Sequence, residues 1–220
     1  MNFYANKPIA IIDSGIGGVS VLRQLLKKFG GGNYIYYADN LNMPYGNKNK
    51  EFIKNRVEYL IKLLKEKYNA ELVIIACNTA STSIEEKNFS NVITMQFNKS
   101  NLYFATNLTK RNLKHLNVIA DDNLPTLIEN NIFSKNLSNI IKEKIKEHNL
   151  DQFSEVVLGC THYELVLDLF KNFAPKTNFI CNSSSIINKI NIHNETEFTI
   201  QLLTSKKDKS FEDKFYELLN

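Results

Sequence analysis

Apolar runs and helical periodicities alternate along the N-terminal part of the chain. Continuous runs of apolar residues, each followed by polar residues, predict buried strands at 9–12, 34–38 and 72–76. Apolar residues that recur every three or four positions predict amphipathic helices at 19–28 and 52–67. Three glycines at 30–32 end the first of these helices. The order strand–helix–strand–helix–strand predicts a parallel sheet covered by helices on both faces, which is an α/β fold.

The pattern is weaker in the second half of the chain, but the same kinds of element recur. Strands are predicted at 102–105, 118–120, 155–158, 178–180 and 198–203. Helices are predicted at 136–147, 163–173 and 211–219. We therefore expect further sheet strands in this half, and a strand and a helix that close the chain.

Two of the predicted strands end in the same motif. At 73–79 and at 156–162, three aliphatic residues are followed by one small residue, a cysteine and two polar residues. This similarity indicates an internal duplication at the scale of half a molecule. In an open parallel sheet, ligands bind in the crevice beyond the carboxyl ends of the strands. Two similar halves that face one another would therefore place Cys77 and Cys160 on opposite sides of one cleft.

Paired thiols across a small cleft suit proton transfer at a carbon stereocentre. One thiolate removes a proton from the carbon, and the other thiol donates a proton to the opposite face. An unperturbed thiol has a pKa of about 8.5, which neighbouring groups can lower toward the working pH. Neutral hydrogen-bond donors near the thiols can also bind a substrate carboxylate, which becomes enediolate-like as the proton leaves. The neutral donors that follow the strand ends are Ser14, Asn78, Thr79 and Thr161.

A lone cysteine after a strand is more often a small core residue than a catalytic group. Cys77 and Cys160 are interpreted differently because their motifs match, whereas Cys181 has no matching motif and is expected to be structural. His162 lies two residues beyond Cys160, where a histidine can act as a proton partner. The other histidines lie in polar stretches and are expected to be solvated: His115, His148 and His193.

A dinucleotide site is one alternative interpretation. Gly15 and Gly17 follow a strand and open a helix, and Asp39 lies at the end of the second strand, as in a dinucleotide-binding fingerprint. The match is imperfect, because Ser20 stands at the third glycine position and an ionised Asp13 would repel a pyrophosphate. A tight turn with close helix packing accounts for the glycines equally well.

A zinc site is a second alternative, with Cys77, Cys160 and His162 as its ligands. Structural zinc sites usually contain cysteines in a C-x₂₋₄-C spacing, and the sequence has no such pair. We therefore expect no bound metal.

Composition is that of an ordinary globular protein. The 220 residues are 43% hydrophobic and 23% charged, with a formal net charge of +4. The lysines are spread along the chain, which argues against a nucleic-acid surface of clustered basic residues. No apolar run approaches the roughly 18–20 residues of a membrane span, and the N-terminus lacks the pattern of a secretory signal. Three cysteines without an export signal indicate reduced thiols and a cytoplasmic location.

Motifs along the chain resemble those of the cofactor-independent glutamate racemases, within the aspartate/glutamate racemase group. They lie at 12–18, at 37–39 with 43–46, at 76–81 and at 158–163. The stretch at 198–219 also resembles the closing strand and helix of that family. The resemblance therefore covers almost the whole chain, and these motifs are specific when they occur together in this order.

The resemblance implies two pseudo-symmetric parallel-sheet α/β domains with the active site in the cleft between them. Residues 1–95 and about 184–220 would form the first domain, and about 96–183 a shortened second domain. The implied reaction interconverts L- and D-glutamate without pyridoxal phosphate or metal. In bacteria, D-glutamate made in this way feeds peptidoglycan synthesis, on which the cell wall and cell shape depend. The implied partners are a small-molecule substrate and a second copy in a homodimer, with no nucleic acid and no membrane.

The resemblance also assigns roles to individual residues. Cys77 and Cys160 are implied as the two acid/base groups, with Asp13 assisting the first and His162 the second. Glu129 lies in a stretch that resembles the source of a further acidic residue, so it is a candidate assistant. The implied substrate-binding residues are Asp13, Ser14, Pro44, Tyr45, Gly46, Asn78, Thr79, Thr109, Thr161 and His162.

The chain departs from the family pattern at three places. It is shorter between about 81 and 102, Ala105 replaces a glycine near Thr109, and Cys181-Asn182 stand where the family tends to have Asp-Ser. Two alternatives therefore stay open: a racemase of aspartate or another amino acid, and a catalytically impaired binding or regulatory relative.

Overall fold

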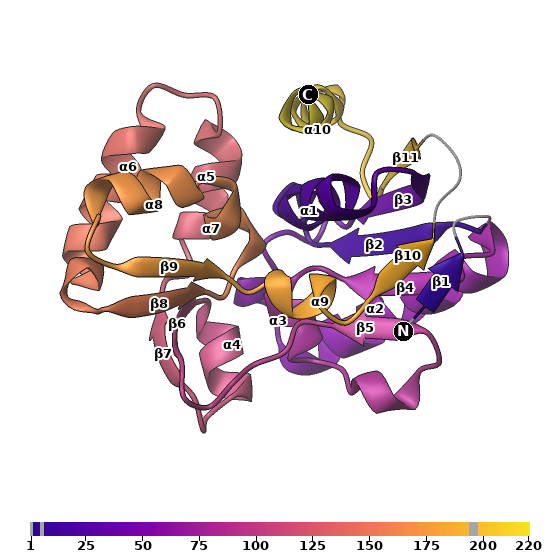
Figure 1. The fold of residues 1–220 in the computed structure, drawn as a ribbon, viewed down its shortest axis with the longest axis horizontal. Coiled ribbons are helices and arrows are strands. Elements are labelled where there is room, and N and C mark those ends of the chain that lie inside the picture. Colours follow the sequence, from indigo (N-terminus) through magenta and orange to yellow (C-terminus); the bar gives the residue numbers. More distant parts are fainter. Residues whose placement is uncertain (1, 5–6, 194–197) are drawn as a thin grey trace.

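Two parallel sheets of five and four strands form the frame of the fold and lie side by side in Figure 1. The computed structural model describes residues 2–4, 7–193 and 198–220. In the order β11-β3-β2-β4-β5, the first sheet contains β11 (Phe198–Thr204), β3 (Gly32–Ala38), β2 (Ile9–Asp13), β4 (Leu72–Ile75) and β5 (Val92–Thr94). In the order β7-β6-β8-β9, the second contains β7 (Asn117–Ala120), β6 (Leu102–Ala105), β8 (Glu155–Leu158) and β9 (Asn178–Cys181). A short parallel pair, β1 (Asn2–Tyr4) with β10 (Asn191–His193), lies beside them.

The two sheets repeat one strand order. The four strands β3-β2-β4-β5 and the four strands β7-β6-β8-β9 follow the same order, in which the second strand along the chain comes first and the first, third and fourth follow it. In the first sheet, β11 is added outside β3. Equivalent backbone bonds join the first and third strands, from Ala76 N to Ile12 O at 2.9 Å and from Gly159 N to Phe104 O at 2.8 Å. The predicted α/β class, with two pseudo-symmetric parallel-sheet units, is confirmed.

Helices cover both faces of the first sheet because its inner strands β2, β3 and β4 are buried on both sides. Ile9 and Ile11 of β2 pack into a cluster with α1 (Val19–Phe29) and α10 (Lys209–Leu219). Ala10 and Ile12 alternate with them and face a second cluster with α2 (Lys50–Tyr68). Figure 1 shows α1 and α10 together above β2 and β3.

The second sheet packs an aromatic cluster under its helices. Phe104 of β6 is fully buried, and its ring stacks on Tyr163 with centroids 4.8 Å apart and meets Phe170 at 6.2 Å. The helices on this face are α5 (Leu124–Asn131), α6 (Leu137–Glu147) and α8 (Leu167–Phe173). The opposite face is covered by α4 (Asn107–Asn112) and by Leu113 and Leu116, which follow it.

The prediction of one helix at 163–173 is wrong in one respect, because the structure contains two helices there. These are α7 (Thr161–Leu165) and α8, which are separated at Val166. The φ of −117° and ψ of 24° at Val166 lie outside the helical region. The break lets α7 lie against α1 while α8 lies against α6. Apolar spacing alone did not show the break, since residues on both sides of it are buried. The short α3 (Asn78–Ser81) follows Cys77, whereas α4, α5 and the short α9 (Ser184–Ile187) were not predicted.

The chain crosses between the sheets twice. It leaves the first sheet after β5, enters the second at β6, and returns through the segment between β9 and α9. The domain limits expected from the resemblance, 1–95 with about 184–220 and about 96–183, remain a prediction. In the part of the chain that the structure describes, the longest helices are too short or too polar to cross a membrane.

A buried carboxylate ties the two units together near the return crossing. Glu164 of α7 is 7% exposed; its Oε2 accepts from Ser20 Oγ of α1 at 3.3 Å, and its Oε1 accepts from the backbone amide of Ser183 at 2.9 Å. Gln24 of α1 donates to Ser183 Oγ at 2.5 Å. Burial raises the pKa of Glu164 to about 7, although these neutral donors partly oppose it.

We predict that Phe104→Ala lowers the free energy of unfolding by about 3–5 kcal/mol, because it opens a cavity at the centre of the aromatic cluster. Urea unfolding followed by circular dichroism measures the change. Phe153→Ala is the matched control: its side chain is 37% exposed, so its effect should stay below about 1 kcal/mol. Equal effects of the two substitutions would contradict the assignment of Phe104 to the core.

We predict that Glu164→Gln weakens the dependence of stability on pH. Since the folded-state pKa is raised, the folded protein binds a proton that the unfolded chain releases, and this contribution is lost as pH rises from about 4.5 through 7. The loss is on the order of 3 kcal/mol in the wild type and absent in the variant. Melting temperatures at pH 5, 6, 7 and 8 test this, with the exposed Glu143→Gln expected to follow the wild type. Parallel pH curves for wild type and Glu164→Gln would refute it.

Candidate active site

A small cavity lies between the carboxyl ends of the strands of the two sheets. It encloses about 20 Å³, which is room for the centre of one water molecule. Both units supply its walls, as expected for a cleft between two similar halves. The lining residues are Ser14, Pro44, Tyr45, Gly46, Cys77, Asn78, Thr79, Thr106, Asp122, Pro125, Cys160, Thr161 and His162.

Cys77 and Cys160 border this cavity from equivalent positions in the two units. Cys77 follows β4 and immediately precedes α3, and Cys160 follows β8 and immediately precedes α7. Both side chains are buried, at 6% and 8% exposure. The duplicated motif in the sequence therefore brings two thiols to one enclosed space.

Cys160 lies beside an imidazole that favours a positive charge. His162 is 2% exposed; its Nδ1 is 3.9 Å from Cys160 Sγ, and its Nε2 is 2.6 Å from Glu129 Oε2 of α5. Burial alone lowers the pKa of His162, but the contacts with Cys160 and Glu129 outweigh it and raise that pKa well above its usual value. The resulting imidazolium places a positive charge beside the Cys160 sulfur.

Glu129 also joins the second unit to the first. Besides His162 Nε2, its Oε2 accepts from the backbone amide of Ile16, in the loop after β2, at 3.1 Å. Glu129 does not line the cavity; it lies behind His162 and fixes the ring. Glu129 therefore reaches the cavity only through His162, and its role as an assistant stays a prediction.

Cys77 lies in surroundings of the opposite kind. Its thiol donates to Ser14 Oγ over 3.9 Å, and burial, followed by the charge of Asp13, raises the pKa of Cys77 well above its usual value. Asp13 is fully buried behind the cavity wall, where its Oδ2 accepts from Thr161 Oγ1 at 3.1 Å. Burial raises the pKa of Asp13 to about 6, with the charge of His162 opposing the rise. The two thiols thus match in position but differ in electrostatic environment.

The glycine-rich loop after β2 is filled by side chains of the second unit. A Cβ on Gly15 would lie 2.5 Å from Glu129 Oε2, and one on Gly17 would lie 2.5 Å from Thr161 Oγ1. Only glycine permits this approach. The space that a pyrophosphate would need is occupied by the protein itself, so the dinucleotide interpretation of this loop is wrong.

Asp39 supports the cavity wall formed by residues 44–46. Its two carboxylate oxygens accept from Arg56 Nη2 at 2.7 Å and Arg56 Nε at 3.0 Å, and Oδ2 also accepts from Tyr45 Oη at 2.7 Å. Burial alone raises the pKa of Asp39, but Arg56 and Tyr45 outweigh it and lower that pKa. Because these groups engage Asp39 fully, it has no free oxygen to offer a ribose.

Asn78 presents an unpaired donor at the cavity. It is 1% exposed, and its Nδ2 is the only buried side-chain nitrogen or oxygen of the described residues that lacks a hydrogen-bond partner. Thr79 Oγ1 lies 3.0 Å from Thr106 Oγ1 and 3.4 Å from Thr109 Oγ1. Thr109 therefore sits behind Thr79 and Thr106 and does not line the cavity.

Sequence reasoning missed Thr106, Asp122 and Pro125. Thr106 follows β6 as Ser14 follows the equivalent strand β2, and Asp122 follows β7 closely. Both oxygens of Asp122 accept hydrogen bonds from Asn107, at 2.8 and 2.7 Å. The strand-end rule applied to the weaker strands at 102–105 and 118–120 would have found the first two residues.

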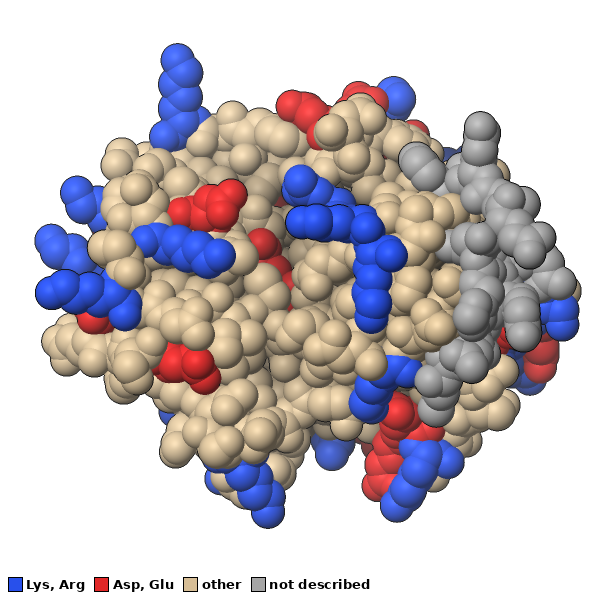
Figure 2. Space-filling view, viewed as in Figure 1, with Lys and Arg blue, Asp and Glu red and all other residues tan. Residues whose placement is uncertain are grey.

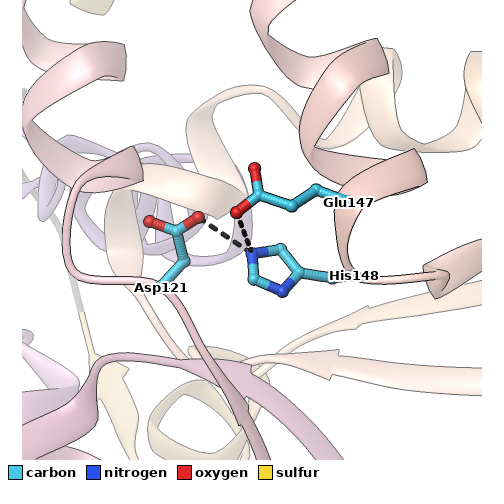
Figure 3. Close-up of side chains that lie close together, drawn as sticks. All are labelled: Asp121, Glu147 and His148. Atoms are coloured by element: carbon cyan, nitrogen blue, oxygen red, sulfur yellow. Dashed lines mark hydrogen bonds and ion pairs between the residues drawn. The ribbon is translucent and has the colours of Figure 1, made fainter.

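One cluster of possible metal ligands occurs in the described residues, away from the two cysteines. Figure 3 shows Asp121, Glu147 and His148, whose ligand atoms lie within 4.8 Å of one another. Lys144 Nζ lies 2.8 Å from an oxygen of each of these acids, so a cation already balances their charges. In that same part of the chain, the trio considered for zinc does not converge in this way.

His148 was expected to be solvated, and this expectation is wrong. Its side chain is 16% exposed, its Nε2 lies 2.9 Å from Asp121 Oδ2, and its ring packs on Phe104 at 5.1 Å. The reason is its place at the end of α6, which turns the ring onto the second sheet. His115 is exposed as expected, and the side chain of His193 lies outside the described ones. Cys181 is half-buried, and burial raises its pKa to about 12.

On the face shown in Figure 2, basic side chains lie at several places, with acidic side chains between some of them. The absence of a nucleic-acid partner stays a prediction from the sequence.

Known proteins resemble the chain in sequence and in fold, although no family model matches it. The glutamate racemase of Halothermothrix orenii is 35% identical over 201 residues, which cover 76% of each chain. A glutamate racemase isoform from Bacillus anthracis has a TM-score of 0.82 at 20% identity, over 98% of this chain and 94% of that one. The Francisella tularensis enzyme, solved with D-glutamate, has a TM-score of 0.72 at 20% identity over the same shares.

The solved structures show that the fold is shared. The sequence identity, which extends over most of both chains, shows the family. The chain belongs to the glutamate racemase family and is an amino-acid racemase, an enzyme of the isomerase class.

Proposed function

We propose that this enzyme interconverts L- and D-glutamate by proton transfer between two cysteines, without a cofactor. The observation that carries the proposal is the convergence of Cys77 and Cys160 on one enclosed cavity, from equivalent strands of two opposed sheets. Racemisation requires acid and base groups on both faces of a carbon, which this arrangement supplies. Glutamate is the substrate named for the sequence relatives, and D-glutamate occupies a structural relative.

The neighbours of the two sulfurs assign their starting roles in this proposal. Cys160, whose sulfur lies 3.9 Å from His162 Nδ1, is the first base, and Cys77, whose pKa is raised by burial and by the charge of Asp13, is the first acid. The Cys160 thiolate takes the α-proton, so that the C–H electron pair becomes an enediolate-like carbanion. The Cys77 thiol then gives its proton to the opposite face, which leaves a thiol at Cys160 and a thiolate at Cys77. The reverse transfer converts the other enantiomer and restores the first state.

Neutral donors bind the substrate in this proposal. The lining side chains are uncharged apart from Asp122, His162 and a cysteine thiolate. The free Nδ2 of Asn78 is placed to donate to the α-carboxylate, and the hydroxyls of Ser14 and Thr79 border the same space. A donor aimed at a carboxylate gains strength as that group becomes an enediolate, which lowers the barrier to proton removal.

The wider role follows from the product. We propose that this activity supplies D-glutamate for peptidoglycan synthesis. A homodimer in the cytoplasm remains part of the proposal.

The roles of Asp13 and Glu129 are indirect: Asp13 holds Thr161, and Glu129 holds His162. Pro44, Tyr45, Gly46 and Thr109 remain predicted substrate-binding positions, of which the first three line the cavity.

We predict that the purified protein racemises L-glutamate and that the product carries deuterium at the α-carbon when the reaction runs in D₂O. Loss of optical rotation and of the α-proton NMR signal measures the two events. Cys77→Ala and Cys160→Ala should each lower racemisation by at least about 10³-fold, because either face then lacks its proton carrier.

Cys181→Ala is the control for these variants and should retain the wild-type rate, since Cys181 lies outside the cavity lining. A folded wild-type protein that leaves L-glutamate unchanged would exclude the proposed reaction. Aspartate and other L-amino acids tested in parallel show whether the same chemistry acts on a different side chain.

We predict that iodoacetamide modifies Cys160 faster than Cys77 or Cys181 at pH 7. The thiolate is the reactive form, and only Cys160 has an imidazolium beside its sulfur, whereas burial raises the pKa of the other two thiols. Mass spectrometry of peptides after timed labelling measures the three rates. Cys181 is the more exposed thiol, so faster labelling of Cys181 would show that access, not charge, decides reactivity.

A further inference from the structure

The amide group of Asn78 has only one of its two ends paired. Its Oδ1 accepts a hydrogen bond, while its Nδ2 is buried at the cavity without a partner. A buried donor without an acceptor is unfavourable in the free protein, and this penalty disappears when a ligand supplies an acceptor. The orientation of this amide therefore decides whether the cavity presents a donor or an acceptor to a substrate carboxylate.

Asn182 fixes that orientation. Its Nδ2 donates to Asn78 Oδ1 at 2.6 Å. Both residues are buried, with Asn182 5% exposed and Asn78 1% exposed. An Asn amide whose oxygen is held by a donor must direct its NH₂ group the other way. Asn78 lines the cavity, and its NH₂ group is the end of the amide that remains without a partner.

The segment that carries Asn182 is itself fixed by both units. Asn182 follows β9 directly and belongs to the return crossing. The next residue, Ser183, donates its backbone amide to Glu164 of α7 and accepts a hydrogen bond from Gln24 of α1. Asn182 therefore precedes a residue that is bonded to a helix of each unit, through its backbone amide to α7 and through its hydroxyl to α1.

We propose that Asn182 is a positioning residue for the racemase reaction, which turns the NH₂ group of Asn78 toward the α-carboxylate of the substrate. The inference rests on the proposed function in one respect, that Asn78 binds this carboxylate. Asn182 touches neither the substrate nor the reacting carbon, since it does not line the cavity. Its effect on the reaction passes through the orientation of one amide.

The variant Asn182→Asp tests this directly. A carboxylate cannot donate to Asn78 Oδ1, but it accepts from Asn78 Nδ2, so the amide turns over and presents its oxygen to the substrate carboxylate. Losing a charge-assisted hydrogen bond and gaining a repulsive contact should raise KM for glutamate about tenfold or more, with a smaller change in kcat. Asn112→Asp is the matched control: it makes the same charge change and removes a donor to Thr82, away from the cavity.

A double-mutant cycle shows whether Asn182 acts through Asn78. In an Asn78→Ala background, Asn182→Asp should raise KM by less than about twofold, because no amide remains to be turned. An equal increase in KM in both backgrounds would overturn the inference. If Asn182→Asp does not fold, as judged by its thermal transition, Asn182→Ala replaces it in the cycle, with an expected increase of about threefold from an amide free to adopt both orientations.

Side-chain amide NMR gives a readout that does not depend on turnover. In ¹⁵N-asparagine-labelled protein, the Asn78 NH₂ signal is assigned by its loss in Asn78→Asp. In the wild type, this signal should shift when D-glutamate is added. In Asn182→Asp, the signal should already lie at a different position without ligand, and it should not shift when D-glutamate is added. A wild-type protein that binds glutamate without any shift of this signal overturns the inference. A protein that shows the shift but does not racemise glutamate retains the inference while excluding the proposed reaction.

Discussion

The close contact between the glycine loop of the first unit and the acid and histidine of the second is the interaction on which the site depends. Glu129 accepts at once from Ile16 of one unit and from His162 of the other, and Thr161 donates across to Asp13. These bonds form only because Gly15 and Gly17 leave no side chain in the way. The groups that tune the two cysteines are therefore the same groups that hold the two sheets together, so the chemistry and the assembly of the units share one set of contacts.

A symmetric frame carries an asymmetric pair of thiols. The strand order and the backbone bonds repeat between the sheets, and both cysteines occupy the start of the helix after the third strand. The residues that follow them differ, and so do the charges that surround them: an imidazole beside one sulfur, and a hydroxyl and a buried carboxylate near the other. The proposed two-base reaction uses both features, because equivalent positions put the two sulfurs on opposite sides of one cavity, and unequal surroundings give each sulfur different neighbours.

The sequence was sufficient for most of the sheet strands, the duplication and the cysteine pair, because these depend on local periodicity and on a repeated motif, but the three-residue strands β1, β5 and β10 were too short to give such a signal. It was insufficient wherever one unit acts on the other. The break at Val166 depends on α7 and α8 meeting different helices, and the burial of His148 depends on Phe104 of a distant strand. Asp39 looked like a ribose ligand until Arg56 and Tyr45 were seen to occupy it. Asn182 had no local signal at all, since its partner lies 104 positions away along the chain.

The small size of the cavity has a kinetic consequence. A space of about 20 Å³ for the centres of water-sized molecules is small for an amino acid with about ten heavy atoms, so the residues that line the cavity must move apart when a substrate binds. Entry and exit of the substrate each require this wider arrangement of the lining. The hydrogen bonds of Glu129 and Asp13 across the two units resist such a movement, so the groups beside the two cysteines also bear on exchange with solvent.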